Sequence, residues 1–255
     1  MSVVGQEDDA RTASAPGPGP GHRRGRRGRR GRIAAVVSVL GELLITTGVL
    51  LGLFVAYSLW WTNVLANREA ERDSAEVREN WAQDGPGGSA QDRTYDAGEG
   101  VGFLHVPAMG GEVLIKKGTD TGELNKGVAG YYTEPVKAVP PWKGEGNFSL
   151  AAHRDGHGAK FHDIHKIEKG DPVVVETEDT WYVYKVYEIL PKTSKYNVEV
   201  LAGVPEVSGR DEPGRYITLT TCTPILTSDY RYIVWGELVR TEKVDAERTP
   251  PEEIR

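Results

Sequence analysis

The stretch RYITLTTCTPILTSDYRYIVWGELV, residues 215–239, contains two runs of β-branched and aromatic residues separated by Pro, Ser and Asp. The first run extends from Arg215 to Cys222 and the second from Tyr230 to Val239. Val, Ile, Thr, Tyr and Trp are enriched in strands, whereas Pro, Ser and Asp are typical of the turns between them. We therefore predict two consecutive strands joined as a hairpin, with Cys222 at the end of the first strand.

The same pattern extends through the residues that precede this stretch. Five further apolar or β-branched runs are bounded by Gly, Pro, Asp or Asn: Val101–Val106, Glu112–Ile115, Asn147–Ala152, Pro172–Glu176 and Thr180–Leu190. Two short segments are helical candidates, 120–126 and 159–167, and no long helix alternates with the strands as a parallel sheet requires. Seven or eight strands in about 140 residues predict a mostly antiparallel β fold, either a closed barrel or a sandwich.

Residues 1–32 differ from the rest of the chain in composition and charge. They contain eight Arg and three acidic residues, a net charge of +5, whereas the whole chain of 255 residues carries −6. Almost no large apolar side chain is present whose burial could offset the entropy of ordering. We predict that residues 1–32 form a disordered basic tail.

The next segment, 33–61, contains a single charge, Glu42. Its uncharged part, 43–61, would form about 28 Å of helix at roughly 1.5 Å per residue, which is enough to cross a bilayer. A cleaved signal peptide is the alternative, but its apolar region is roughly 7–15 residues long and precedes a small-residue cleavage site. Here the run is longer and ends in Trp60 and Trp61, which are typical of a membrane interface. The segment is therefore predicted to be a transmembrane helix.

The charges around this span predict its orientation. Because the Arg-rich tail lies on the N-terminal side, the positive-inside rule places the N-terminus in the cytoplasm and the β domain outside a single-pass cell-membrane helix. Residues 64–82 contain helix formers with interleaved charges and no Gly or Pro, so we expect a solvated helical stalk. Residues 85–100 are rich in Gly, Asp and Ser, which is typical of a flexible linker. The predicted organisation is a cytoplasmic tail (1–32), a transmembrane helix (33–61), an extracellular stalk and linker (62–100), a β-barrel domain (101–243) and a C-terminal tail (244–255).

Composition excludes several classes of function. At 38% hydrophobic and 27% charged residues, the chain is neither wholly disordered nor a polytopic transporter. A single cysteine, Cys222, excludes an intrachain disulfide and zinc sites with two or four cysteines. Basic residues are concentrated in the tail and no nucleic-acid-binding motif follows them, so we expect no nucleic-acid partner.

Three residues at predicted strand ends carry groups suited to acyl-transfer chemistry. A lone cysteine is more often a buried apolar side chain than a reactive one, but Cys222 lies where a strand gives way to a loop, and reactive groups are accessible there. Arg231 opens the following strand, so the hairpin can return a permanent positive charge towards the thiol, which favours thiolate and stabilises an oxyanion. His153 ends another strand, and with an ordinary pKa of about 6.5 it can act as a general acid and base.

A metal site is the alternative interpretation of the histidines. The spacing of His153, His157, His162 and His165 resembles a set of metal ligands. However, His162 and His165 fall on the segment predicted to be an amphipathic helix, with no fixed carboxylate partner. We therefore expect neither a bound metal nor a cofactor. His105 alternates within the first predicted strand, where a structural or exposed role is expected.

The motif Thr218-Leu219-Thr220-Thr221-Cys222 matches the TLxTC signature of sortases, the membrane-anchored cysteine transpeptidases of Gram-positive cell walls. With His153 upstream, Arg231 downstream and an N-terminal anchor, residues 101–240 resemble this family. The stretch Gly127–Tyr132, the pair Gly146-Asn147 and the stretch Ala151–Arg154 are most similar to class E sortases. Members of that class carry a tyrosine ahead of the catalytic histidine and favour an LAxTG signal over LPxTG. The resemblance implies a closed antiparallel or mixed β-barrel of seven to eight strands with a few short helices.

The resemblance also implies roles for individual residues. Cys222 would attack the Thr–Gly bond of a C-terminal sorting signal, Arg231 would stabilise the oxyanion, and His153 would exchange protons with the leaving and incoming amines. Tyr131 or Tyr132 would contact the sorting signal. Further substrate contacts are expected from two residues of the motif, Thr220 and Thr221. The implied partners are secreted proteins that bear the signal and an amine of a peptidoglycan precursor.

Two other functions stay open on the sequence. A pilin-polymerising sortase would use a pilin lysine as the nucleophile, but the aspartate-containing lid usual in that class is not apparent here. A non-catalytic anchored module would bind peptides in the barrel without needing Cys222, His153 and Arg231 together. The presence of all three therefore favours the cell-wall transpeptidase.

Overall fold

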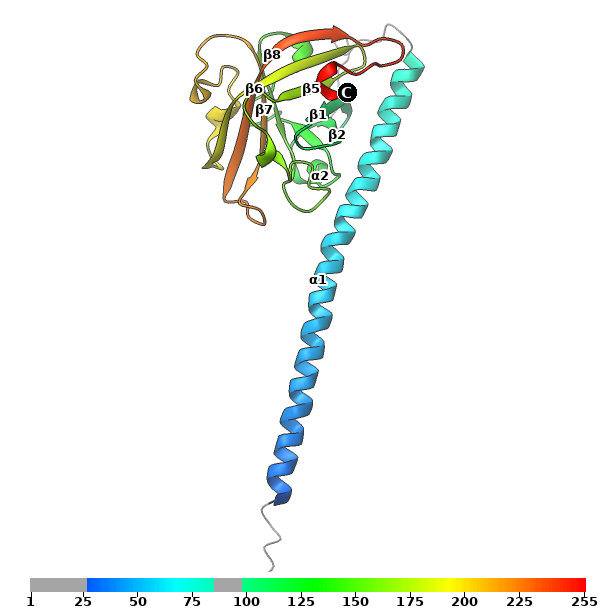
Figure 1. Ribbon diagram of the computed structural model, residues 1–255, viewed down its shortest axis with the longest axis vertical. Helices are drawn as coiled ribbons and strands as arrows, with labels where there is room; N and C mark the ends of the chain where they lie inside the picture. Colours follow the sequence, from blue (N-terminus) through cyan, green and yellow to red (C-terminus); the bar gives the residue numbers. More distant parts are fainter. Residues whose placement is uncertain (1–26, 85–97) are drawn as a thin grey trace, which may run out of the picture. The chain divides into compact units, whose positions relative to one another are not determined.

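The computed structural model describes residues 27–84 and 98–255, and its centre is a closed barrel of eight strands (Figure 1). In chain order the strands are β1 (Gly100–His105), β2 (Glu112–Lys117), β3 (Ala129–Tyr131), β4 (Gly146–Ala151), β5 (Pro172–Glu176), β6 (Thr180–Ser194), β7 (Arg215–Thr223) and β8 (Tyr230–Lys243). Around the barrel they follow the order β1, β2, β3, β4, β7, β8, β6, β5, after which β5 pairs with β1. The predicted barrel is confirmed, and the seven runs identified in the sequence are all strands.

The pairing is mixed, because two of the eight strand pairs are parallel. β2 runs parallel to β3 and β4 runs parallel to β7, while the other pairs are antiparallel. The eighth strand, β3, was not predicted, and it has only three residues, Ala129–Tyr131. The parallel β4–β7 pair matters for the site, because the carboxyl ends of these two strands meet at the same end of the barrel.

Helical structure in the barrel domain is limited to short segments. The candidate at 120–126 is confirmed as α2 (Thr121–Leu124), whose N-cap Asp120 accepts a hydrogen bond from the Glu123 amide. The candidate at 159–167 is wrong in extent, since only the 3-10 turn Ile164–Lys166 forms there. Left-handed backbone at Ala159 excludes the predicted helical start at that residue. The other 3-10 turns are Pro141–Lys143, Val198–Leu201, Glu206–Ser208 and Glu252–Ile254.

The barrel interior is filled by aliphatic and aromatic side chains from every strand. Those of Leu104, Ile115, Leu150, Ile217 and Leu219 are fully buried there. The buried pattern is continuous along most strands and does not alternate, because loops, turns and the end of α1 cover much of the outer surface. This rigid sheet is the support from which the functional side chains project.

The long helix α1 (Arg27–Asp84) begins before the predicted start at Ile33. Residues up to Phe54 and residues from Val55 onwards belong to two separate compact units. By length and composition, α1 is able to cross a membrane, and its side chains from Ile33 to Val55 are almost all exposed. The predicted disordered tail up to residue 26 and most of the predicted linker, 85–97, lie outside the described residues.

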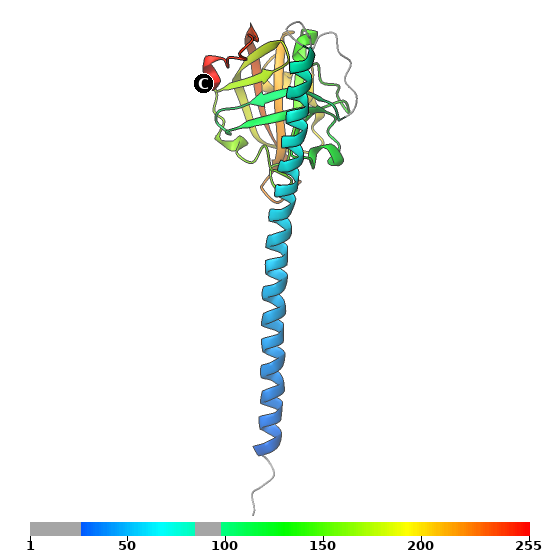
Figure 2. The same cartoon turned by 90° about the vertical axis from the view of Figure 1, so that its right-hand side faces the viewer.

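The part of α1 after the apolar segment is helical as predicted, but it is not solvated on all sides. In both ribbon views the last turns of α1 run beside the barrel (Figures 1 and 2). Ala70, Val77 and Trp81 of α1 form a buried cluster with Phe103, Leu114 and Val128 of the barrel domain. The Trp81 ring meets the Phe103 ring edge to face at a centroid distance of 5.4 Å. The expectation of a solvated stalk is therefore wrong for this face, because burial of its apolar stripe outweighs the helix's charged composition.

Candidate active site

Three neighbouring strands bring the predicted site residues to one end of the barrel. Cys222 near the end of β7 pairs with Arg231 at the start of β8 in the antiparallel register. On the other side of β7, the parallel register pairs Ala151 with Thr220. His153 lies two residues after Ala151, and Cys222 lies two residues after Thr220. The parallel register therefore places His153 and Cys222 at neighbouring strand ends. The order across this end is thus His153, Cys222, Arg231.

Side-chain and backbone contacts join the ends of β4 and β7. The Thr221 hydroxyl donates to the Ala152 carbonyl at 2.7 Å, and the Ala152 amide donates to the Thr220 carbonyl at 3.4 Å. Thr220 and Thr221 are both buried. In this arrangement the Thr221 hydroxyl supports the strand end that carries His153, while a direct contact with substrate stays a prediction for both threonines.

Arg154 is a further cross-link whose role the sequence did not reveal. Its side chain is buried, and Nη1 donates to the Thr223 hydroxyl at 2.8 Å and to the Cys222 carbonyl at 3.4 Å. Its guanidinium also lies over the Tyr232 ring, 5.5 Å from the centroid. Arg154 therefore ties the residue after His153 to the strand that carries the cysteine.

His153 is half-buried and makes one side-chain hydrogen bond among the described residues. Its Nε2 lies 2.9 Å from Oδ1 of Asn125, which follows α2. Burial and the neighbouring imidazole of His157, 5.5 Å away between ring centroids, lower the pKa of His153, and Asp155 opposes part of this shift. His153 is consequently held largely neutral near pH 7. The contact between Asn125 and His153 was not predicted, because no sequence spacing links the two positions.

Cys222 and Arg231 are half-buried, as His153 is. Cys222 is half-buried and its thiol is free. Nη1 of Arg231 donates to the carbonyl oxygens of Ser228 and Tyr230, at 3.0 Å each, within the β7–β8 turn. These contacts keep the guanidinium beside the turn that follows the cysteine, where it provides permanent positive charge.

The two candidate tyrosines have different surroundings. Tyr131 is buried in the barrel core, where it packs on Phe148 at 5.8 Å, and burial together with Glu99 raises its pKa to about 12. Tyr132 is partly buried, and its hydroxyl is influenced by the charge of Arg231 and by the side chain of Thr220, which oppose the rise in pKa caused by burial. Of the pair, Tyr132 therefore belongs to the surroundings of Cys222.

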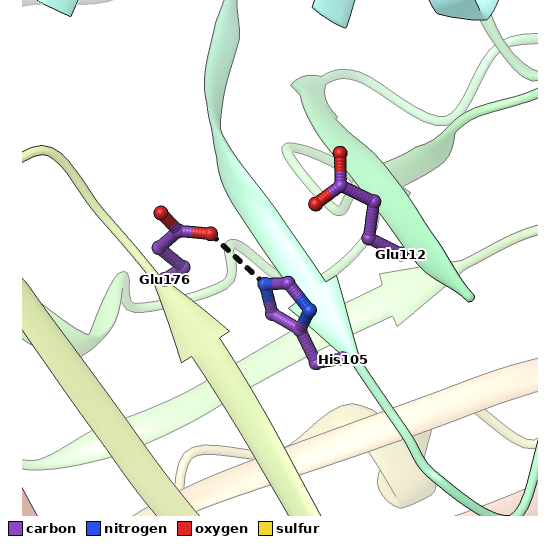
Figure 3. Close-up of side chains that lie close together, drawn as sticks. All are labelled: His105, Glu112 and Glu176. Atoms are coloured by element: carbon purple, nitrogen blue, oxygen red, sulfur yellow. Dashed lines mark hydrogen bonds and ion pairs between the residues drawn. The ribbon is translucent and has the colours of Figure 1, made fainter. Parts of the chain in front are cut away.

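The described residues do not bring the four histidines of the alternative metal interpretation together. His162 directs Nδ1 to the Arg154 carbonyl at 2.9 Å, and His165 is exposed on the 3-10 turn. A different set, His105, Glu112 and Glu176, has its potential ligand atoms within 4.8 Å of one another (Figure 3). That set lies among strands β1, β2 and β5, away from Cys222 in the strand order.

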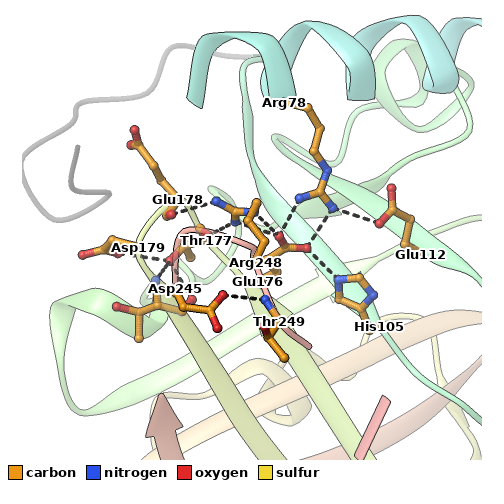
Figure 4. A network of polar contacts seen from close by, with 11 residues as sticks. Arg78, His105, Glu112, Glu176, Thr177, Glu178, Asp179, Asp245, Arg248 and Thr249 are labelled. Carbon is orange, nitrogen blue, oxygen red and sulfur yellow. Dashed lines mark hydrogen bonds and ion pairs between the residues drawn. The ribbon is translucent and has the colours of Figure 1, made fainter. Parts of the chain in front are cut away.

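Guanidinium groups, however, already surround this second set (Figure 4). The buried carboxylate of Glu176 accepts hydrogen bonds from Arg78 of α1 and Arg248 of the C-terminal segment, and it contacts His105 Nε2 at 2.9 Å. Arg78 also reaches Glu112 at 3.0 Å. Two cations on the same carboxylate disfavour a third, so the cluster fits an ion-pair network that joins α1 and the C-terminal segment to the barrel.

Comparison with known proteins places this geometry in a family. Residues 104–239 match the sortase domain. The chain is 67% identical to sortase SrtE2 of Streptomyces coelicolor over 91% of this chain and 93% of that protein. It is 48% identical to sortase SrtE1 of the same organism, over 78% of this chain and 56% of that protein.

Solved structures agree with this placement. The crystal structure of sortase E1 from Streptomyces coelicolor with a tripeptide in the active site superposes with a TM-score of 0.59 at 45% identity. That match covers 64% of this chain and 100% of the other. Sortase E from Streptomyces avermitilis gives a TM-score of 0.54 at 35% identity, over 63% of this chain and 100% of the other. The resemblance to class E sortases is confirmed.

Proposed function

This chain belongs to the sortase family of cysteine transpeptidases, and from that premise we propose that it cleaves a C-terminal sorting signal of the LAxTG or LPxTG type between Thr and Gly. It then transfers the cleaved protein to an amine of a cell-wall precursor. The observation that carries this proposal is the order His153, Cys222, Arg231 across the adjoining ends of β4, β7 and β8. This order allows a nucleophile to lie between a proton donor and a fixed positive charge.

In the first half of the reaction, the Cys222 thiolate attacks the carbonyl carbon of the Thr–Gly bond. A carbon–sulfur bond forms, and the negative charge that develops on the carbonyl oxygen is stabilised by Arg231. When the tetrahedral intermediate collapses, the carbon–nitrogen bond breaks and the leaving Gly amine takes its proton from the His153 imidazolium. The product is a thioester between the substrate protein and Cys222.

In the second half, neutral His153 removes a proton from the incoming amine. The amine attacks the thioester, a new amide bond forms, and the carbon–sulfur bond breaks to return the thiolate. Because burial and His157 lower the pKa of His153, only a minority of molecules hold His153 as imidazolium at neutral pH. We expect slow turnover and a bell-shaped pH profile.

Tyr132 is the residue to which we assign recognition of the signal. It lies beside Thr220 and Arg231, whereas Tyr131 is part of the core. A phenolic hydroxyl there can hydrogen-bond to the signal's backbone and replace packing that the proline of LPxTG would supply.

The cellular setting follows from α1. Its apolar part anchors the protein as a single-pass membrane helix, with the basic N-terminus in the cytoplasm and the barrel outside the cell. Secreted proteins that carry the sorting signal and the acceptor amine are then on the same side of the membrane as Cys222.

The test uses the full chain in detergent micelles with an LAxTG peptide, an LPxTG peptide and excess diglycine. Mass spectrometry should detect the peptide cleaved after Thr and joined to diglycine, and a Cys222→Ala chain should form none. A lysine-bearing pilin peptide as a competing acceptor separates wall transfer from pilin polymerisation. If a folded chain binds the peptides and its thiol can be alkylated, but no product forms, the result would instead support the peptide-binding module.

A further inference from the structure

The loop that follows His153 has a strained backbone at its apex, residues 156–159. Four consecutive residues adopt left-handed φ values: Gly156 at 65°, His157 at 44°, Gly158 at 82° and Ala159 at 42°. Such angles are unfavourable for His and Ala, and they persist only where the surroundings impose them. Whatever holds this apex also places the His157 ring next to the His153 ring.

The base of the loop is fixed by the barrel. The Phe161 amide donates to the His153 carbonyl at 3.0 Å, and the Phe161 side chain is fully buried in the core. Arg154 is tied to Thr223, as described above. These contacts secure the two ends of the loop, and within the apex the Ala159 amide donates to the Gly156 carbonyl at 2.8 Å.

The apex is held by α1. Oδ1 of Asn63 accepts a hydrogen bond from the Gly158 amide at 2.8 Å, and Oδ1 of Asn67 accepts one from Nζ of Lys160 at 3.1 Å. The two asparagines are one helical turn apart, so they present their acceptors on the same face. Gly158 also packs tightly, since a Cβ added to it would lie 3.0 Å from Oδ1 of Asn67.

The same turn of α1 reaches the other neighbour of His153. Between the two asparagines, Ala66 is buried against Gly127, whose own added Cβ would lie 3.0 Å from the Ala66 carbonyl oxygen. Gly127 lies two residues after Asn125, whose side chain is hydrogen-bonded to the His153 ring. One helical turn thus contacts both segments that surround the histidine.

We infer that Asn63 and Asn67 are positioning residues for His153, so that the helix leaving the membrane forms part of the support of the active site. The inference rests on the proposed function, because it assigns these residues to a step that His153 performs. Its physical basis is that general acid–base transfer requires the imidazole within hydrogen-bond reach of the reacting amine, and small displacements slow such steps strongly.

The experiment measures transfer from the LAxTG peptide to diglycine by the full chain in micelles, with rates given per alkylatable Cys222. Asn63→Ala removes the acceptor for Gly158 and retains a good helix former. Asn80→Ala makes the same exchange on an exposed position of the same helix and is the matched control. Asn63→Asp restores an oxygen acceptor at the same place and tests for rescue.

For Asn63→Ala we expect kcat to fall about tenfold with KM changed less than about twofold. Relaxation of the apex moves His157 away from His153 and admits water, and both changes raise the pKa of His153. The acid limb of the pH profile should therefore move to higher pH. The charged groups that act on the pKa of His153 are His157, which lowers it, and Asp155, which raises it. A merely lower yield of folded protein would leave that limb in place. Asn63→Asp should return kcat to near the wild-type value.

The outcomes separate this inference from the proposed function. No product from the wild-type chain would refute the proposed function, and this inference with it. Product from the wild type, together with an Asn63→Ala chain that matches Asn80→Ala in kcat and pH profile, would overturn this inference alone, as would failure of Asn63→Asp to rescue. If Asn63→Ala does not fold, Asn67→Ala should lower kcat about threefold, and an unchanged kcat would overturn the inference.

Discussion

Replacement of Glu176 by Gln should destabilise the protein more than any other single Glu→Gln exchange in the Arg78–Arg248 network. The Glu176 side chain is only 2% exposed and accepts hydrogen bonds from both arginines. Burial alone would raise its pKa, but the bonds from His105, Arg78 and Arg248 outweigh burial and lower the pKa from 4.5 to about 2.

That shift sets the size of the effect. Each pKa unit corresponds to about 1.4 kcal/mol, so a carboxylate lowered from 4.5 to about 2 contributes about 3 kcal/mol to the free energy of unfolding. Because the pKa of the folded state is the lower one, the contribution is complete above pH 4.5 and is lost as the pH falls towards 2. Glu176→Gln should therefore lower the Tm by about 6–12 °C at pH 7, a range appropriate to roughly 150–250 residues.

Thermal unfolding of the full chain in micelles, followed by tryptophan fluorescence from pH 7 to pH 3, measures this directly. The matched control is Glu112→Gln, which removes the other carboxylate bonded to Arg78. The Glu112 side chain is 44% exposed, so we expect a loss below about 1 kcal/mol. The Tm difference between wild type and Glu176→Gln should shrink to less than half by pH 3. Equal Tm values for the two variants at pH 7, or a difference that does not change with pH, would refute the reasoning.

Three further predictions follow from the site and from α1. Tyr132→Phe should change the ratio of LAxTG to LPxTG transfer by about threefold with little change in maximal rate, whereas Tyr131→Phe should leave that ratio unchanged. Competition assays with the two peptides measure the ratio, and equal ratios in both variants would show that Tyr132 does not recognise the signal. His157→Gln removes a like charge from His153 and raises its pKa, so the acid limb of the pH–rate profile should move to higher pH and the maximal rate should rise about twofold; an unmoved limb contradicts the assigned interaction. Trp81→Ala should cost about 3–5 kcal/mol by thermal unfolding, because its ring is buried against the barrel, and an unchanged Tm would mean that α1 is not docked there in solution.

The strands were predictable because each run of β-branched residues is long enough to stand out against its turns. β3 was not, since three residues, Ala129–Tyr131, carry no usable periodicity. Its existence depends on pairing with β2 and β4, which are tertiary contacts. The helix predicted at 159–167 was wrong for a similar reason. Its regularly spaced apolar residues are buried in the core, but the backbone that carries them forms turns and not an α-helix.

The positions of Cys222, His153 and Arg231 at one end of the barrel were predictable because each lies next to a recognisable strand end, while their catalytic roles stay a prediction. The residues around them were not predictable. Asn125 is separated from His153 by two strands and several turns, and only the closed barrel brings them together. The choice between Tyr131 and Tyr132 likewise depends on which of two adjacent side chains points into the core. A strand of three residues is too short for its sequence to indicate which side chains face the core.

The segment that follows the apolar part of α1 shows why charged composition alone does not predict a solvated helix. Its many charges indicate a solvated helix. Two of its charged residues nevertheless face the barrel and form ion pairs there: Arg78 with Glu176, and Asp73 with Lys116 at 2.7 Å. The apolar side chains Ala66, Ala70, Val77 and Trp81 of the same segment recur at intervals of four and seven residues, a spacing that predicts one buried stripe. A helix that is docked by paired charges as well as by apolar burial is fixed in rotation as well as in position. That fixed rotation is what would allow Asn63 and Asn67 to meet the loop beyond His153.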